Sequence, residues 1–276
     1  MSQPGHRQLE RFLSTHPRLA VLAGAGCSTG SGIPDYRDDN GEWKHAKPVQ
    51  FADFLRDADV RKRYWARSFA GWGRIASARP NAAHTALAAL EEHGFVERLI
   101  TQNVDNLHRR AGSRRVIDLH GVLDKVRCLD CDLITGRPGF QRRLQDVNAE
   151  WVAEVTAVAP DGDAALSRSD FSSFVVPECP NCGGILKPDV VFFGESVPAR
   201  RVQEASDAVS NADALLVVGS SLMVFSGFRF ARIARELGKP IAIVNRGVTR
   251  ADDMANLKIR EDCTKVLPAF VERIAA

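Results

Sequence analysis

The sequence predicts an α/β protein with a doubly wound, mostly parallel sheet, an inserted small domain and a helical lobe. Short apolar runs alternate with segments of helical spacing, and the first apolar run stops at a cluster of glycines. A strand buried on both faces is a continuous apolar run, and alternating strands and helices are typical of parallel sheets. The alternation and the glycine cluster therefore indicate a nucleotide-binding type of fold.

The apolar runs predict the strands, and the segments of helical spacing predict the helices. The predicted strands are Leu19–Ala23, Glu97–Thr101, Val116–Leu119, Ala214–Gly219 and Pro240–Asn245. Apolar residues at helical spacing predict helices at Ala82–His93, Arg200–Ser210, Phe228–Leu237 and Thr264–Ile274.

Two segments interrupt the alternation. Residues 38–79 are charged and aromatic and are predicted to form a helical lobe outside the sheet. Residues 127–188 carry two Cys-x-x-Cys pairs and the Pro-, Gly- and Asp-rich stretch Ala159–Asp163, so we expect a small domain there. The large domain is then discontinuous and consists of residues 1–37, 80–126 and 189–276.

Composition narrows the class of protein. The chain has 276 residues, of which 45% are hydrophobic and 26% charged, as in an ordinary folded protein. A formal charge of +3 does not indicate nucleic acid as the main partner. Because the apolar runs are much shorter than the roughly 20 residues of a membrane helix, we expect no membrane partner and a cytoplasmic location.

Four of the six cysteines have the spacing of metal ligands. They form the pairs Cys128/Cys131 and Cys179/Cys182. In a reducing compartment this spacing favours a metal over disulfides, and four thiolates satisfy the tetrahedral preference of zinc without an open position. The sequence predicts one structural zinc ion, with a disulfide pair or an iron–sulfur cluster as alternatives.

A glycine-rich loop follows the first strand. Gly24, Ala25, Gly26 and Ser28 lie in it, where backbone N–H groups can approach a pyrophosphate. The loop lacks the spacing of G-x-G-x-x-G and the Gly-Lys-Ser/Thr ending of a P-loop, which disfavours hydride transfer and ATP hydrolysis. The alternative is an ordinary tight turn.

The continuation of this loop resembles a known family. Residues 24–37 fit the pattern Gly-Ala-Gly-x-Ser-x-x-x-Gly-Ile-Pro-Asp-aromatic-Arg, which is similar to the signature of the sirtuins. The resemblance implies that Asp35 lies near the nicotinamide amide of NAD, that Tyr36 lines the cofactor site, and that Arg37 lies near the phosphates and ribose. Without it, Asp35 and Arg37 would be an ordinary surface ion pair.

A second block of polar residues follows the second strand. Gln102, Asn103, Val104 and Asp105 stand at a strand end, where α/β sheets place their ligands. Taken alone they would be a polar helix cap. The block through Gly112 also resembles sirtuins, which implies that these four residues contact NAD.

His120 follows the third strand, at the same edge of the sheet. A lone histidine is more often structural, but the resemblance implies a general base, and the near-neutral pKa of histidine suits that task. His108 is the competing histidine and is expected to be structural. Asn103 and Asp105 would assist by positioning the ribose, a water molecule and the cofactor.

The implied reaction consumes NAD. In the family the acyl-lysine carbonyl oxygen attacks the anomeric carbon of NAD, nicotinamide leaves and an alkylimidate forms. The general base then deprotonates a ribose hydroxyl, which attacks the imidate carbon, and water releases lysine and O-acyl-ADP-ribose. The expected partners are therefore proteins that carry acylated lysines.

Later motifs complete the implied cofactor site. Gly219, Ser220 and Ser221 follow the fourth strand and fit a nucleotide contact. Asn245, Arg246 and Gly247 follow the fifth strand and fit the adenosine ribose. By the same resemblance, Cys263 lies at the adenine end of NAD.

The substrate side carries two further expectations. Val190, Val191, Phe192, Phe193 and Gly194 resemble the sirtuin segment that binds substrate backbone as an added strand. Without the family they would be a core strand. Residues 187–194, 63–67 and 159–163 resemble the class II branch of the family most closely.

Tyr64 and Arg67 form a Tyr-x-x-Arg pair on one helix face. In desuccinylating sirtuins such a pair binds the carboxylate of the acyl group, which predicts a preference for acidic or branched acyl chains. The alternative is a solvated arginine beside a packed tyrosine.

The motifs are also compatible with two other functions. An ADP-ribosyltransferase would use the same NAD site but leave ADP-ribose on a protein side chain. An NAD-sensing or zinc-ribbon binding module would have no turnover, and the presence of His120, Asn103 and Asp105 disfavours it.

Overall fold

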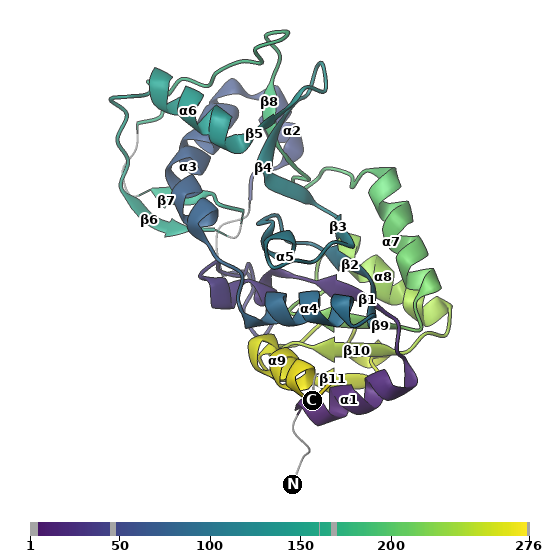
Figure 1. Ribbon diagram of the computed structural model, residues 1–276. Coiled ribbons are helices and arrows are strands. Elements are labelled where there is room, and N and C mark those ends of the chain that lie inside the picture. The colour runs from purple at the N-terminus through teal and green to yellow at the C-terminus, as the bar shows by residue number, and fades with distance from the viewer. Residues whose placement is uncertain (1–4, 45–47, 160, 167–169, 275–276) are drawn as a thin grey trace.

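The computed structural model describes residues 5–44, 48–159, 161–166 and 170–274, so Pro160 of the Ala159–Asp163 stretch lies outside the described residues. A six-stranded sheet forms the larger part, in the order β11-β10-β9-β1-β2-β3, and every adjacent pair of strands is parallel (Figure 1). Its strands are β1 (Leu19–Ala23), β2 (Val96–Thr101), β3 (Val116–Asp118), β9 (Ala214–Val218), β10 (Ile241–Val244) and β11 (Leu257–Ile259). The predicted α/β class is confirmed.

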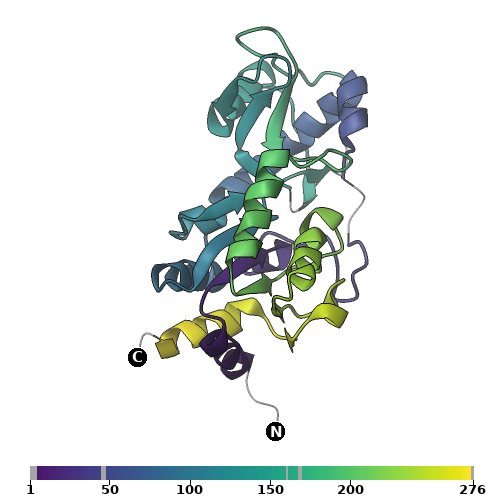
Figure 2. The same cartoon turned by 90° about the vertical axis from the view of Figure 1, so that its right-hand side faces the viewer.

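Helices cover both faces of this sheet, as the two views show (Figures 1 and 2). One face packs on α1 (Gly5–Thr15), α4 (Ala82–Glu92) and α9 (Cys263–Ile274), and the other on α7 (Ala199–Asn211) and α8 (Phe225–Glu236). Along β1, Leu19 and Val21 belong to the first core, whereas Ala20 and Leu22 belong to the second. Because side chains alternate along a strand, an apolar run such as Leu19–Ala23 fills both cores at once.

The smaller part of the molecule contains the segments that interrupt the alternation. Its antiparallel sheet has the order β5-β4-β8, and a separate hairpin joins β6 to β7. These elements are β4 (Gly121–Cys128), β5 (Ile134–Gly136), α6 (Arg137–Val147), β6 (Val155–Val158), β7 (Ala164–Leu166) and β8 (Leu186–Val190), with α2 (Phe51–Arg56) and α3 (Ala58–Ser77) packed beside them. Trp65 of α3 is fully buried and donates its indole N–H to the Leu186 carbonyl at 3.0 Å. The predicted helical lobe and the predicted small domain therefore share one core.

The register of the large sheet determines where the site lies. Ala23 of β1 pairs with Thr101 of β2 and Val218 of β9, and Thr101 pairs with Asp118 of β3. The strands thus end at the same level, and the residues after them emerge at one edge, facing the smaller part of the molecule. Short helices follow at this edge: the 3₁₀ turns η1 (Ala25–Cys27) and η2 (Thr29–Ser31), and α5 (Leu107–Arg110). A third 3₁₀ turn, η3 (Asp252–Met254), precedes β11.

None of the helices among the described residues is both long and apolar enough to span a bilayer.

Candidate active site

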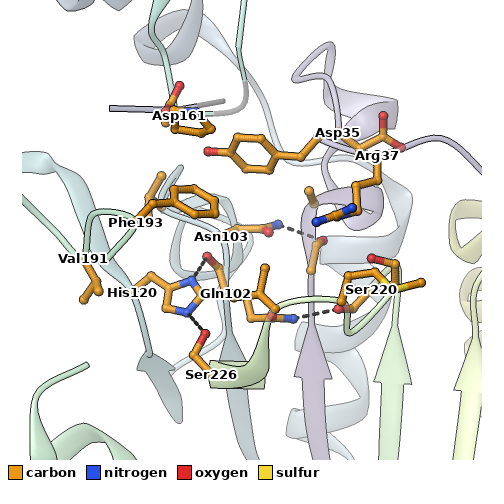
Figure 3. A pocket seen from close by; sticks show the side chains of 18 of the residues that line it. Asp35, Arg37, Gln102, Asn103, His120, Asp161, Val191, Phe193, Ser220 and Ser226 are labelled. Atoms are coloured by element: carbon orange, nitrogen blue, oxygen red, sulfur yellow. Dashed lines mark hydrogen bonds between the residues drawn. The ribbon is translucent and has the colours of Figure 1, made fainter. Parts of the chain in front are cut away.

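A cavity of about 830 Å³ opens at this edge of the sheet, and Figure 3 shows part of its lining. Most of the residues predicted to bind NAD line it: Gly24, Ala25, Gly26, Ser28, Asp35, Tyr36, Arg37, Gln102, Asn103, Val104, Asp105, Gly219, Ser220, Ser221, Asn245 and Gly247. His120 and Tyr64 line the same cavity. Residues from four motifs far apart in the sequence thus share one site.

The glycine loop packs directly on the turn after β9. The Gly26 N–H donates to the Gly219 carbonyl at 2.8 Å, and the Gly24 N–H donates to the Val218 carbonyl at 3.0 Å. Gly219 has a φ of +57°, and a Cβ there would lie 2.4 Å from the Cys27 nitrogen. Only glycine fits this crossing of two turns.

A buried hydrogen-bond network holds the polar residues of the second motif. Ser28 Oγ donates to Asp105 Oδ2 at 2.6 Å, and Asn103 Nδ2 donates to Ser28 Oγ and to the Gly24 carbonyl, both at 3.0 Å. Asp105 Oδ1 also accepts from the Leu107 N–H at 2.9 Å, as in the predicted helix cap. Burial raises the pKa of Asp105, although these hydrogen bonds oppose the shift. The network therefore fixes the glycine loop relative to β2.

His120 has a defined tautomer. Its Nδ1 lies 2.9 Å from the Gln102 carbonyl oxygen, and its Nε2 lies 2.8 Å from Ser226 Oγ (Figure 3). A carbonyl can only accept, so Nδ1 carries the proton and Nε2 has the lone pair. Burial lowers the pKa of His120 to about 4, partly opposed by the Gln102 hydrogen bond and helped by Arg201. The imidazole is thus neutral near pH 7, which is the state that a general base needs.

His108, the competing histidine, is not among the residues that line the cavity. It is buried in α5 with its ring centroid 4.7 Å from that of His84, and burial lowers its pKa well below the usual value.

The segment after the glycine loop contributes side chains above the cavity. Asp35 accepts from Lys44 Nζ at 2.6 Å, whereas Arg37 donates to the Gly41 carbonyl at 2.7 Å and lies 4.2 Å from the Trp43 ring centre. The two residues do not form the simple ion pair with each other that the sequence also allowed. Tyr36 is hydrogen-bonded to Asp161, and burial raises the pKa of its hydroxyl.

Three of the predicted contact residues are not among the described residues that line the cavity. Arg246 is half exposed and lies 3.9 Å from Asp262. Cys263 is buried behind the glycine loop, with Sγ 3.8 Å from the Gly26 carbonyl. Arg67 pairs with Asp163 at 3.0 Å and donates to the Ala164 carbonyl at 2.9 Å.

The predicted substrate segment, residues 190–194, packs partly in the core and partly lines the cavity. Val190 ends β8 and Phe192 is buried against Phe54 and Tyr64, as a core strand would be. Val190, Val191, Phe192, Phe193 and Gly194 all line the cavity. The Val191 N–H donates to the His120 carbonyl at 2.8 Å, which joins this segment to the turn between β3 and β4.

The four cysteines of the small domain converge. Their sulfur atoms all lie within 4.8 Å of one another, with 3.5 Å between Cys128 and Cys182 and 3.7 Å between Cys131 and Cys179. These separations exceed the roughly 2.05 Å of a disulfide bond and suit a tetrahedral ion held by four thiolates. This is a structural zinc site, as predicted.

Three cavity residues were not predicted as site residues. Trp43, Asp161 and Ser226 line the cavity, and Asp161 and Ser226 lie on either side of the His120 region in Figure 3. Trp43 and Ser226 come from a loop and a helix start without a motif, whereas Asp161 lies in the stretch 159–163, which stands out only for its resemblance to the class II branch.

The fold and the site together define a class. The cavity is large enough for a dinucleotide and lies at the carboxyl ends of the parallel strands, with a neutral histidine in its wall and a Cys₄ site in the adjoining small sheet. These are the parts of an NAD-dependent protein deacylase.

The model of the Sir2 family matches residues 24–226, and the chain belongs to this family. The NAD-dependent protein deacetylase 2 of Bradyrhizobium diazoefficiens is 58% identical over 262 residues, which are 95% of this chain and 96% of that protein. Human NAD-dependent protein lipoamidase sirtuin-4, mitochondrial, is 51% identical over 265 residues, which are 95% and 84% of the two chains. The solved complex Sir2-p53 peptide-NAD+ has a TM-score of 0.78 and 31% identity, with 98% of both chains covered.

Proposed function

We propose that this NAD-dependent protein deacetylase uses His120 as general base to transfer the acyl group of a protein lysine to ADP-ribose. Nicotinamide, O-acyl-ADP-ribose and free lysine would be the products. The observation that supports the proposal best is the state of His120, a neutral imidazole whose Nε2 lone pair is directed to Ser226 beside the cavity. A group in this state can accept the proton that a ribose hydroxyl loses.

The neighbouring residues would bind and orient NAD as the co-substrate. The Gly24–Gly26 turn suits the pyrophosphate because glycine and alanine leave room for its approach, and the Ala25 N–H would be its donor, since the N–H groups of Gly24 and Gly26 donate to Val218 and Gly219. Asn103 and Asp105 are held rigidly by Ser28, so that they can position the nicotinamide ribose without reorganising. The cysteine site would keep the small domain folded beside the cavity and take no part in the chemistry.

The acyl group is expected to be uncharged. Arg67 is already paired with the buried Asp163 at 3.0 Å, and Arg67 is not among the described residues that line the cavity. Asp161 lines the cavity instead, and burial raises the pKa of its carboxyl, so this part of the cavity disfavours the negative charge of an acidic acyl chain. Tyr64 borders the cavity but is packed in the core, as the alternative interpretation of the Tyr-x-x-Arg pair requires, whereas Arg67 is ion-paired and not simply solvated. Acetyl and neutral longer acyl chains fit this electrostatic environment better than succinyl or glutaryl.

Further assignments belong to the same proposal. The substrates would be acylated lysines in proteins, with Val191, Phe193 and Gly194 beside the substrate backbone. The relationship to human sirtuin-4 supports a place in the class II branch. A zinc site made of four cysteines supports a reducing, cytoplasmic location. The functional division would be the large NAD-binding domain (1–37, 80–126 and 189–276), the lobe 38–79 and the zinc domain 127–188.

A panel of acylated peptides tests the function. Acetyl-, lipoyl-, succinyl- and glutaryl-lysine peptides would be incubated with the enzyme and NAD, with nicotinamide and free lysine measured in parallel. We expect equimolar release of both from the neutral acyl peptides and only with NAD present. ADP-ribose left on protein, with no free lysine, would instead identify a transferase.

A further inference from the structure

The lone pair of His120 Nε2 already has a partner in the absence of substrate. Ser226 Oγ lies 2.8 Å from this nitrogen, and Nδ1 is occupied by the Gln102 carbonyl at 2.9 Å. Because Nδ1 carries the only ring proton of the neutral imidazole, the Ser226 hydroxyl must be the donor in its bond to Nε2. The serine therefore stands at the place where a general base receives its proton.

Ser226 is fixed from two sides. It is the second residue of α8, and Gly227, which follows it, packs so closely that an added Cβ would lie 2.2 Å from Gln102 Oε1. Gln102 in turn holds His120 through its carbonyl and donates to Ser220 Oγ at 2.7 Å. The strand end, the histidine and the start of α8 thus form one rigid unit, which keeps the serine and histidine in register.

Ser226 also faces the cavity, so a substrate hydroxyl can reach its oxygen. A hydroxyl both donates and accepts, and can pass a proton on when a base is bonded to it, as in other serine–histidine pairs. The first turn of α8 adds partial positive charge at this point, which stabilises negative charge on Oγ during transfer.

We propose that Ser226 relays the proton from the ribose hydroxyl of the co-substrate to His120. This inference rests on the proposed role of His120 and adds a residue to it. The ribose O–H bond breaks as the ribose oxygen bonds to the acyl carbon, and its proton moves to Ser226 Oγ. The original Ser226 proton moves at the same time to His120 Nε2, which leaves an imidazolium with Nδ1 still bonded to the Gln102 carbonyl.

Ser226→Ala tests the relay, with Ser226→Thr as the variant that keeps a hydroxyl. Deacetylation of an acetyl-lysine peptide would be measured beside the exchange of labelled nicotinamide into NAD, which reports only the step before the base acts. We expect deacetylation to fall about 100-fold in Ser226→Ala, the lower range for a positioned proton-transfer group, while exchange stays within about twofold. Ser226→Thr should recover most of the rate.

Solvent isotope effects give a second readout that a structural role would not change. A plot of the deacetylation rate against deuterium fraction should be curved for wild type, since two protons move together, and linear for Ser226→Ala. Ser210→Ala, which removes a hydroxyl from the exposed surface of α7, is the matched control.

Deacetylation by Ser226→Ala at or above the wild-type rate would overturn the relay, because the serine would then only obstruct the histidine. An equal loss of exchange and deacetylation would also overturn it and indicate a structural role. His120→Ala separates the two proposals: if it retains deacetylation, the role of His120 fails, whereas a fully active Ser226→Ala beside an inactive His120→Ala refutes the relay alone.

Discussion

Arg67 allows a quantitative test of whether its guanidinium stabilises the fold through Asp163 or binds the acyl group of the substrate. Its side chain is 35% exposed and pairs at 3.0 Å with Asp163, whose side chain is only 5% exposed. Breaking a fully buried ion pair costs about 3–5 kcal/mol, because one charge is left without its partner. Since Arg67 is partly exposed and Asp163 can take up a proton, we expect about 2 kcal/mol for Arg67→Ala.

That loss corresponds to a melting temperature lower by about 4–8 °C for a chain of this size. Removing Arg67 should lower activity toward acetyl, succinyl and glutaryl peptides by a similar factor, because the guanidinium does not line the cavity. Thermal unfolding and the acyl-peptide panel would be measured on the same preparations. The double variant Arg67→Ala/Asp163→Asn should recover part of the stability, as no buried carboxylate is left without a cation.

A selective loss of succinyl and glutaryl activity, with an unchanged melting temperature, would refute this reasoning. It would show that Arg67 leaves Asp163 and binds the carboxylate of the acyl chain.

Three further predictions concern the zinc site, a buried histidine and a glycine turn. Cys179→Ser should reduce the zinc content, measured by atomic absorption, to about one-tenth or less and unfold the small domain; full zinc occupancy would count against the Cys₄ assignment. Burial lowers the pKa of His84 to about 4 in the folded state. Below about pH 6.5 the unfolded state therefore binds more protons than the folded state, and the free energy of unfolding decreases as the pH is lowered. Between pH 7 and pH 5 the contribution of His84 should fall by about 2 kcal/mol, measured as the difference between urea denaturation of wild type and His84→Gln; equal pH slopes would contradict it. Gly219→Ala should raise the KM for NAD more than it lowers kcat, since its Cβ would displace the glycine loop, and an unchanged KM would show that the loop tolerates the shift.

Much of the large sheet could be predicted because its strands are short, apolar and parallel. Predicted and observed strands differ by a residue or so at their ends, as at Val96 and at Val218. The exceptions have physical reasons: β11 is three residues long and contains Lys258, and α1 lies in a segment whose charged residues concealed its apolar face.

Some of the site residues could likewise be predicted from the sequence, and others could not. Cys128, Asn103 and His120 lie in local motifs whose spacing determines a ligand set or a strand end. Ser226 and Asp161 reach the cavity only through tertiary packing, since one begins a helix and the other lies in a loop between two short strands. The contact between Arg67 and Asp163 joins residues far apart in the chain, so no pattern around either residue could predict it.

The central claim is that neutral His120 acts as general base after nicotinamide has left. Its most direct test is His120→Ala, assayed for nicotinamide exchange and for deacetylation of an acetyl-lysine peptide, with His93→Ala on the exposed end of α4 as control. We predict that exchange persists while deacetylation falls by about 100-fold or more, and that His93→Ala changes neither. Deacetylation by His120→Ala at the wild-type rate would contradict the account.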